Sequence, residues 1–569
     1  MTQANLLLIL HCHLPYVRHP EHDDFLEEDW FFEAVAETYV PLLLALERLE
    51  EDAVPFPLAL SVSPTLCEML ANPLLQRRLA RYLDRHVDLA EAEVRRTRAT
   101  PFADAARMYA RHYRTVRDAC ATRYGGDILQ AFARLHRAGR LELIASAATH
   151  ALLPLLASPQ ARRAQVEVGL QCFRRHFGVR PRGFWLPECA FDPAVPRLLA
   201  EFGLGCFFLD THGILLADPA PPAGVFAPLA TPDGPLAFGR DVETGRQVWS
   251  AQEGYPGDPV YREFHRDLGY DADPERLAPC LPADGARRPV GLKYHRVTGA
   301  CPLGDKRPYE PAAAVARARQ HAAHFVARRT EQARRIARAL GPALGRAPVI
   351  VAPYDAELFG HWWFEGVHFL ETVARLAASQ SVWRFATPGE LLDNGRAGGP
   401  GGAPSGRPAT SSWGDGGYFD PWVNPANDWI QPALQAADAQ MRALAQMRAL
   451  AQTRALAQTR ALAQTRALAQ TRALAAACGP PGDLARRALN QCARLLLLAQ
   501  AGDWPFLVYT GTARQYASGR VRSLLGRFDH LARCLRRGGL EERVVAEHEW
   551  LDDPFPDIDF RVWTPSRSD

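Results

Sequence analysis

The sequence lacks the features that mark several classes of protein. Its 569 residues include 11 cysteines but no C-x-x-C pair, which argues against a zinc ribbon or a disulfide framework and fits a reducing compartment. The apolar run Leu6 to Leu10 is too short for a signal peptide or a membrane span. The formal net charge of +3 gives no basic field for nucleic acid. We therefore expect a cytoplasmic protein that binds neither nucleic acid nor membrane.

Short apolar segments alternate with long helical stretches rich in Arg, Ala and Leu, such as Pro311 to Leu340. This alternation is typical of an α/β fold and predicts a βα barrel of about seven strands, whose functional groups lie at the carboxyl ends of the strands. The predicted strands are Asn5 to Leu10, Phe56 to Val62, Leu141 to Ser146, Gly183 to Leu186, Gly205 to Leu209 and Pro348 to Ala352.

Composition divides the chain into three parts. Residues 1–393 hold the predicted strands and form the expected catalytic barrel. Residues 394–412 are rich in Gly, Pro, Ala and Ser and predict a flexible linker. Residues 413–569 are expected to form a mainly helical domain that packs against the rim of the barrel and completes a crevice.

A tandem repeat of six hexapeptides occupies residues 441–476. Its Ala, Leu, Arg and Gln content favours a helix. Successive repeats turn a helix by roughly 600°, so the repeated leucines lie about 240° apart and form no apolar stripe. We expect the repeat to lengthen an exposed helix or loop; the alternative is a rod that binds a partner.

Two predicted strands end in acidic residues among aromatic ones. Glu188 follows Trp185-Leu-Pro, and Asp355 follows Pro353-Tyr354 just after the predicted strand Pro348 to Ala352. Two carboxyl groups beside aromatic faces suit glycosidic-bond chemistry, in which one protonates the leaving oxygen and the other attacks carbon or activates water. Glu357 and Glu365 are expected to be structural, paired with His361 or a nearby arginine.

Three histidines also follow predicted strands. His11 and His13 point to the same side of an extended segment, and His150 follows another strand. They could bind a metal, as in barrel-like carbohydrate deacetylases, or hydrogen-bond sugar hydroxyls and the catalytic acids without a metal. Spacing alone leaves both open.

The ordered motifs resemble glycoside hydrolase family 57, and within it the 1,4-α-glucan branching enzymes. The family motifs are His11-Cys-His-Leu-Pro-Tyr16, Ala148-Thr-His150, Trp185-Leu-Pro-Glu-Cys-Ala190 and Tyr354-Asp-Ala-Glu-Leu-Phe-Gly-His-Trp-Trp363. The branching-enzyme segments are Gln247-Val-Trp-Ser250, Gly254-Tyr-Pro-Gly-Asp258, Tyr261-Arg-Glu-Phe264, Gly291-Leu-Lys-Tyr-His295, Ser412-Trp-Gly414 and Asp503-Trp-Pro-Phe506.

The resemblance implies a distorted (β/α)7 barrel followed by a helical domain, with Glu188 as nucleophile and Asp355 as general acid/base. It implies no metal and no cofactor, so His11, His13 and His150 are expected to position substrate and carboxylates. Further residues expected to line the substrate crevice are Arg240, Gly257, Trp413 and Asp503, with Trp249 and Trp422 as additional stacking platforms.

The implied reaction retains configuration. Asp355 protonates an α-1,4 linkage while Glu188 attacks, and the glycosyl-enzyme passes the chain to a glucan 6-hydroxyl. Such a pair lies about 5–5.5 Å apart, and burial should raise the pKa of Asp355. The substrate is amylose, glycogen or a maltodextrin; the residues indicate no particular oligomeric state.

One segment departs from the family pattern. Related branching enzymes carry a longer loop with a tyrosine, whereas Gly213 to Ala237 is short and has none. That loop is thought to keep water from the intermediate, so the departure favours an alternative, a predominantly hydrolytic α-amylase-like enzyme. A metal-dependent carbohydrate deacetylase and a non-catalytic glucan-binding protein are the remaining alternatives.

Overall fold

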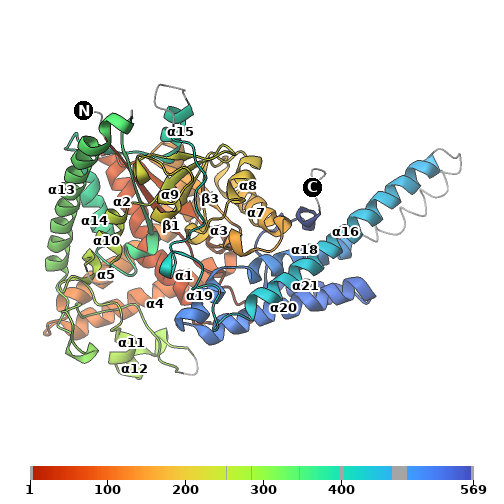
Figure 1. The fold of residues 1–569 in the computed structure, drawn as a ribbon. Helices are drawn as coiled ribbons and strands as arrows, with labels where there is room; N and C mark the ends of the chain where they lie inside the picture. Colours follow the sequence, from red (N-terminus) through yellow and green to blue (C-terminus); the bar gives the residue numbers. More distant parts are fainter. Residues whose placement is uncertain are drawn as a thin grey trace.

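The computed structural model describes residues 4–250, 253–282, 285–344, 346–396, 403–463 and 483–564. A curled sheet lies at the centre, helices surround it, and a group of long helices lies beside it (Figure 1). In the described part of the chain, no helix has the length and apolar character needed to cross a membrane. None of the described cysteines forms a disulfide.

The sheet confirms the predicted barrel. Over the described residues, seven parallel strands follow one another in the order β7-β5-β4-β3-β2-β1-β8. Their bounds are β1 Ala4–Cys12, β2 Leu58–Val62, β3 Leu141–Ser146, β4 Gly183–Trp185, β5 Cys206–Leu209, β7 Leu236–Gly239 and β8 Val349–Asp355. β6 (Leu229–Ala230) pairs antiparallel with β7, and β9 (Trp383–Phe385) pairs parallel with β1.

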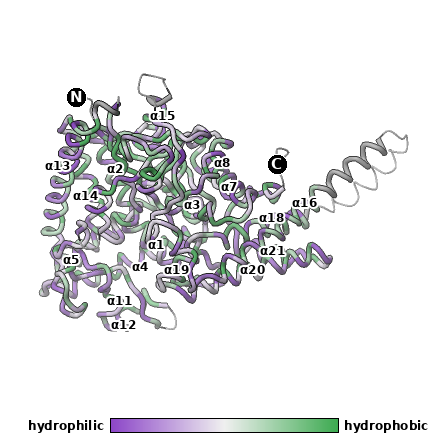
Figure 2. Tube along the Cα trace, viewed as in Figure 1, coloured by the Kyte–Doolittle hydropathy of each residue, from purple (hydrophilic) through white to green (hydrophobic). Residues whose placement is uncertain are grey.

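Burial on both faces explains why the strands read as continuous apolar runs. All nine residues of β1 are buried, as expected for a parallel strand covered by helices on one face and by the barrel interior on the other. Hydrophobic residues gather in the central strands, while hydrophilic ones follow outer helices such as α13 (Figure 2). A backbone hydrogen bond of 2.9 Å from Asp241 to Val351 joins the segment after β7 to β8.

Helices connect the strands of the barrel and cover the sheet, and further helices lie in the insertions between strands. α7 shows how the sequence sets their ends: Ser158 caps its amino terminus, Pro159 opens it, and Gly178 ends it in the left-handed region. The helices are α1 Glu28–Ala34, α2 Val40–Glu51, α3 Pro64–Ala71, α4 Pro73–Thr97, α5 Ala103–Asp118, α6 Ile128–Arg137, α7 Pro159–Phe177, α8 Val195–Glu201, α9 Thr211–Leu215, α10 Val242–Trp249, α11 Leu268–Asp271, α12 Pro274–Leu277, α13 Pro311–Leu344, α14 Gly366–Ala377 and α15 Pro388–Arg396.

The carboxyl-terminal part is helical and docks on the barrel through buried polar contacts. Thr149 Oγ1 donates to the Leu497 carbonyl at 2.5 Å, and Gln165 Nε2 donates to Gln500 Oε1 at 3.0 Å. These bonds hold the segment that contains His150 against the carboxyl-terminal helices. The helices of this part are α16 Ile430–Ala463, α18 Asp483–Ala499, α19 Asp503–Thr510, α20 Arg514–Arg537 and α21 Glu542–Leu551.

Residues 404–411 belong to the predicted linker 394–412 and lie against the barrel. This segment runs along the barrel and forms backbone bridges at Ser405, Arg407 and Ser411 with Ala230, Asp218 and Phe191 respectively. Gly and Pro allow the chain to follow the surface, and the backbone bonds then hold it there.

The hexapeptide repeat begins inside the helical packing. In the first unit Met441, Leu444 and Ala445 are buried, whereas Met447 of the second unit is 51% exposed. The predicted helix is confirmed as far as Ala463, the end of α16. Residues 464–476 lie outside the described residues.

Candidate active site

The two predicted acids lie at the carboxyl ends of barrel strands. Asp355 is the last residue of β8 and lies in register with His11 of β1. Glu188 stands three residues beyond the end of β4. Strand ends of one parallel barrel meet at the same rim, so the fold brings both carboxyl groups to one site.

Glu188 is held in a strained turn. Its φ of 58° and that of Cys189, 49°, lie in the left-handed region, where residues with a Cβ are uncommon. Trp413 fixes this turn twice: its indole Nε1 donates to Glu188 Oε2 at 2.6 Å, and its backbone N–H donates to the Glu188 carbonyl at 3.0 Å. The turn therefore holds the carboxylate in one orientation against an aromatic wall.

Glu357 supports the Asp355 side of the site. It is buried and accepts hydrogen bonds from the Tyr39 hydroxyl and, at 3.0 Å, from the backbone N–H of His13. His361, the partner expected for Glu357, pairs with Glu37 at 2.7 Å. The predicted pairing is therefore wrong, whereas the buried and hydrogen-bonded setting of Glu357 agrees with the structural role expected of it.

Both candidate catalytic carboxyls have raised pKa values. Burial, together with the charge of Asp355, raises the pKa of Glu188 to about 8, against the opposing hydrogen bond from Trp413. Burial raises the pKa of Asp355 to about 6, as predicted, although His13 and Arg240 favour its ionised form. Two such groups titrate as a pair, and the pair holds one proton between about pH 6 and 8.

The three predicted histidines form one stack beside the carboxyls. His11 and His150 share a hydrogen bond of 2.9 Å between their Nε2 atoms, and the His13 and His150 ring centroids are 3.7 Å apart. His150 Nδ1 lies 3.7 Å from Glu188 Oε1. Burial, reinforced by the neighbouring imidazoles, lowers the pKa of His11 and His150 well below the usual range, so both are neutral.

The stack brings together atoms that could hold a metal ion. Ligand atoms of the three rings lie within 4.8 Å of one another. However, both nitrogens of His13 hold hydrogen bonds, Nδ1 to Ser63 Oγ at 2.8 Å and Nε2 to Asp503 Oδ1 at 2.9 Å. Because a metal ligand needs a free nitrogen lone pair, the donor set fits a hydrogen-bond network better than a three-histidine ion site.

Asp503 brings the helical part of the chain into the site. It is the first residue of α19, and its Oδ1 accepts the His13 bond. Its Oδ2 is buried and has no hydrogen-bond partner in the described part of the chain. A carboxylate oxygen in that state is suited to accept from a substrate hydroxyl.

Arg240 lies beside Trp413 at the site. It pairs with Asp210 at 3.2 Å, and its guanidinium carbon lies 5.4 Å from the centroid of the Trp413 ring. A shallow pocket of about 310 Å³ lies beside it, lined also by Trp249, which is 37% exposed. Gly245 leaves room for the arginine, since a Cβ there would lie 3.1 Å from its Nη2.

Two predicted residues stand apart from this network. Trp422 is 1% exposed and packs against Leu152 and Ala190, so its ring offers no face to a sugar. Gly257 is the exposed last residue of the short 3-10 turn Tyr255–Gly257. This turn lies against α13, where the ring centroids of Tyr255 and His321 are 4.5 Å apart.

Sequence reasoning missed Ser63 and Asp210. Each follows a strand, β2 and β5 respectively, and the position after a barrel strand is the signal that could have identified them. Ser63 orients His13, and Asp210 orients Arg240.

Comparison with known proteins places the chain in a family. The family model "Glycosyl hydrolase family 57" matches residues 7–397, and "1,4-alpha-glucan branching enzyme, C-terminal" matches residues 463–563. The chain is 32% identical to a 1,4-alpha-glucan branching enzyme of Thermococcus kodakarensis over 97% of this chain and 77% of the relative.

Similarity to solved structures supports the same family. The alpha-amylase AmyC from Thermotoga maritima is 37% identical with a TM-score of 0.86, covering 99% of both chains. The GH57-type branching enzyme from Pyrococcus horikoshii is 32% identical with a TM-score of 0.82, covering 99% of this chain and 97% of the other. The chain belongs to glycosyl hydrolase family 57.

Proposed function

We propose that this protein is a retaining 1,4-α-glucan branching enzyme, with Glu188 as nucleophile and Asp355 as general acid/base. The observation that carries the proposal is the pair of strand-end carboxyls that together hold one proton near neutral pH. Retaining glycosidic chemistry needs one ionised and one protonated carboxyl in the same site. The match of residues 463–563 to the branching-enzyme carboxyl-terminal model supports the transferase activity.

The proton must lie on Asp355 when the bond breaks. In the free pair the higher pKa of Glu188 favours the proton there. Positive charge developing on the anomeric carbon stabilises ionised Glu188, while the glycosidic oxygen accepts a hydrogen bond from protonated Asp355. Glu188 then attacks that carbon, the C–O bond breaks, and the Asp355 proton passes to the leaving 4-oxygen.

The second half-reaction reverses these roles. Asp355, now ionised, takes the proton of a glucan 6-hydroxyl, whose oxygen attacks the anomeric carbon and releases Glu188. Two inversions at one carbon retain its configuration and give an α-1,6 branch.

The walls of the site supply binding groups. Trp413 and Trp249 offer ring faces, and Asp503, Arg240, His11, His13 and His150 offer polar atoms for hydroxyls. We assign no sugar contact to Trp422, because it is buried. The substrate is an α-1,4-glucan such as amylose, glycogen or a maltodextrin, and the enzyme works without metal or cofactor in the cytoplasm.

Hydrolysis is the second candidate, and one observation favours it. The short segment 213–237 is tied down by bridges from Asp218 to Arg407 and from Ala230 to Ser405. A segment pinned in this way is poorly placed to cover the intermediate, which would leave the glycosyl-enzyme open to water.

Incubation with amylose separates the two outcomes. Enzymatic debranching followed by chain-length analysis measures α-1,6 links, and reducing ends are measured in parallel. New branches with few new reducing ends support the proposal, whereas new reducing ends without branches would establish hydrolysis.

A further inference from the structure

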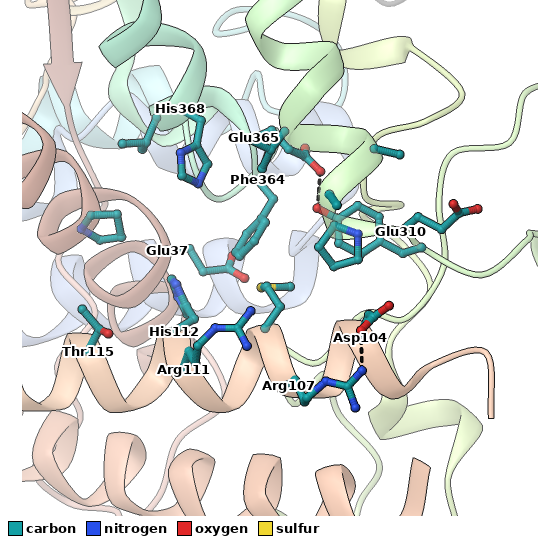
Figure 3. A pocket seen from close by; sticks show the side chains of 18 of the residues that line it. Glu37, Asp104, Arg107, Arg111, His112, Thr115, Glu310, Phe364, Glu365 and His368 are labelled. Atoms are coloured by element: carbon teal, nitrogen blue, oxygen red, sulfur yellow. Dashed lines mark hydrogen bonds and ion pairs between the residues drawn. The ribbon is translucent and has the colours of Figure 1, made fainter. Parts of the chain in front are cut away.

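A second cavity lies on the outer face of the barrel. It has a volume of about 940 Å³ and is bounded by α5 and α13, with α2 and α14 behind (Figure 3). These helices lie on the side of the barrel away from α18, α20 and α21 (Figure 1). The cavity is therefore separate from the crevice at the carboxyl ends of the strands.

The wall of this cavity combines apolar and aromatic surface. Leu44, Met108 and Val116 supply aliphatic surface, and Phe364 projects between Glu365 and Glu37 (Figure 3). Phe364 is partly exposed, and the Arg262 guanidinium carbon lies 4.5 Å from its ring centroid. An aromatic ring reached from a cavity is a surface on which the apolar face of a sugar ring can pack.

Most charges on the wall are already balanced. Arg107 pairs with Asp104, Arg48 pairs with Glu371 at 2.6 Å, and Glu37 pairs with Arg262 at 2.6 Å. In the described part of the chain Arg111, Arg319 and Glu310 hold no ion pair, so exposed donors and an exposed acceptor of opposite charge remain on the lining. A nearly neutral lining favours a neutral ligand over a strongly charged one.

The deeper wall holds polar atoms without partners. Glu365 is 1% exposed; its Oε1 accepts from the Tyr309 hydroxyl at 2.5 Å and from the Arg262 backbone at 3.2 Å. Its Oε2, and His112 Nε2, are buried and have no hydrogen-bond partner among the described residues. Both atoms are closed to the cavity, so the hydrogen-bonding groups that a ligand can reach are the exposed side chains of Arg111, Arg319 and Glu310.

We propose that this cavity is a second carbohydrate site that binds a stretch of α-1,4-glucan away from the catalytic crevice. Sugar hydroxyls both donate and accept, which matches the exposed carboxylate of Glu310 and the exposed guanidinium groups of Arg111 and Arg319. The choice of α-1,4-glucan rests on the proposed function. A polymer held here keeps its other segments near the crevice at a raised effective concentration.

Calorimetric titration of the Glu188→Gln enzyme with maltoheptaose tests the site, because this variant binds without turnover. We expect two molecules per chain. Ala316→Trp, added on the exposed face of α13 at the cavity, should reduce this to one. Ala323→Trp is the matched control, on the same helix, exposed and outside the lining, and should keep two.

Three outcomes would overturn the inference. The first is binding of one maltoheptaose molecule per chain by the Glu188→Gln enzyme. The second is binding of two molecules by the Glu188→Gln/Ala316→Trp variant with unchanged thermal unfolding. The third is displacement of the second molecule by inorganic phosphate, which would make the cavity an anion site. Binding only at the crevice defeats this inference and leaves the proposed function standing, whereas no binding at all defeats both.

Discussion

Replacing Trp413 with Phe isolates one hydrogen bond to the proposed nucleophile. The indole N–H lies 2.6 Å from Glu188 Oε2 and favours the ionised carboxylate. A hydrogen bond to a charged group contributes about 1.5–3 kcal/mol, so its loss should raise the pKa of Glu188 by about 1–2 units. The phenyl ring keeps an aromatic surface between Trp185 and Arg240, which limits the change to the bond itself.

The effect should appear on one limb of the pH profile. The singly protonated pair is the active form, so kcat/KM should rise at about pH 6 and fall at about pH 8. In Trp413→Phe the basic limb should move up by about 1–2 pH units, because Glu188, the group of higher pKa in the free pair, loses its proton there. Between the limbs the form with ionised Glu188 and protonated Asp355 becomes rarer, so kcat/KM should fall about 10–100-fold. The acid limb should stay, since the proton lost there comes from Asp355 while Glu188 remains protonated.

The assay is the initial rate of glycosidic-bond cleavage on a soluble maltooligosaccharide across this pH range. Trp422→Phe is the matched control, because Trp422 Nε1 is buried and has no partner among the described residues. Its pH profile should match that of the unaltered enzyme. If the basic limb of Trp413→Phe does not move, or both limbs move together, the assignment of Glu188 as the ionised nucleophile is refuted.

Four further results are expected. Asp355→Asn should lower kcat by about 10²–10⁴, the usual range for a lost general acid; near-normal turnover would contradict its role. His13→Ala leaves the Asp503 carboxylate without its bond, so the free energy of unfolding should fall by about 1–3 kcal/mol and KM should rise. Incubation with a chelator should leave activity unchanged, since hydrogen bonds occupy both nitrogens of His13; a loss restored by a divalent ion would revive the deacetylase hypothesis. Deletion of residues 447–470, four whole repeats, should change neither activity nor melting temperature.

Local patterns predicted the strands and the acids that follow them, because both depend on adjacent residues. β3 was predicted to the residue, since its six residues are all buried between helical segments. β7, with four residues, and β9, with three, are too short to show a period and were missed. The ordered path of residues 404–411 was missed because its bonds go to distant segments.

The same limit applies to the site. His13 and Asp503 are 490 residues apart in sequence, and no local pattern shows that they bond. The resemblance identified both residues, but the role of Ser63 and Asp210 in orienting their neighbours depends on the positions of strands that meet only in the folded barrel.

Strained backbone conformations are concentrated at the candidate active site. In the described part of the chain six residues other than glycine have positive φ, and three of them, His150, Glu188 and Cys189, lie at the candidate active site. Such conformations cost of order 1–3 kcal/mol each and persist only where surrounding contacts impose them. Trp413 supplies that contact for Glu188 through both its backbone and its indole. Since Trp413 follows the segment 404–411, the bridges that hold this segment on the barrel also hold the residue that clamps the nucleophile.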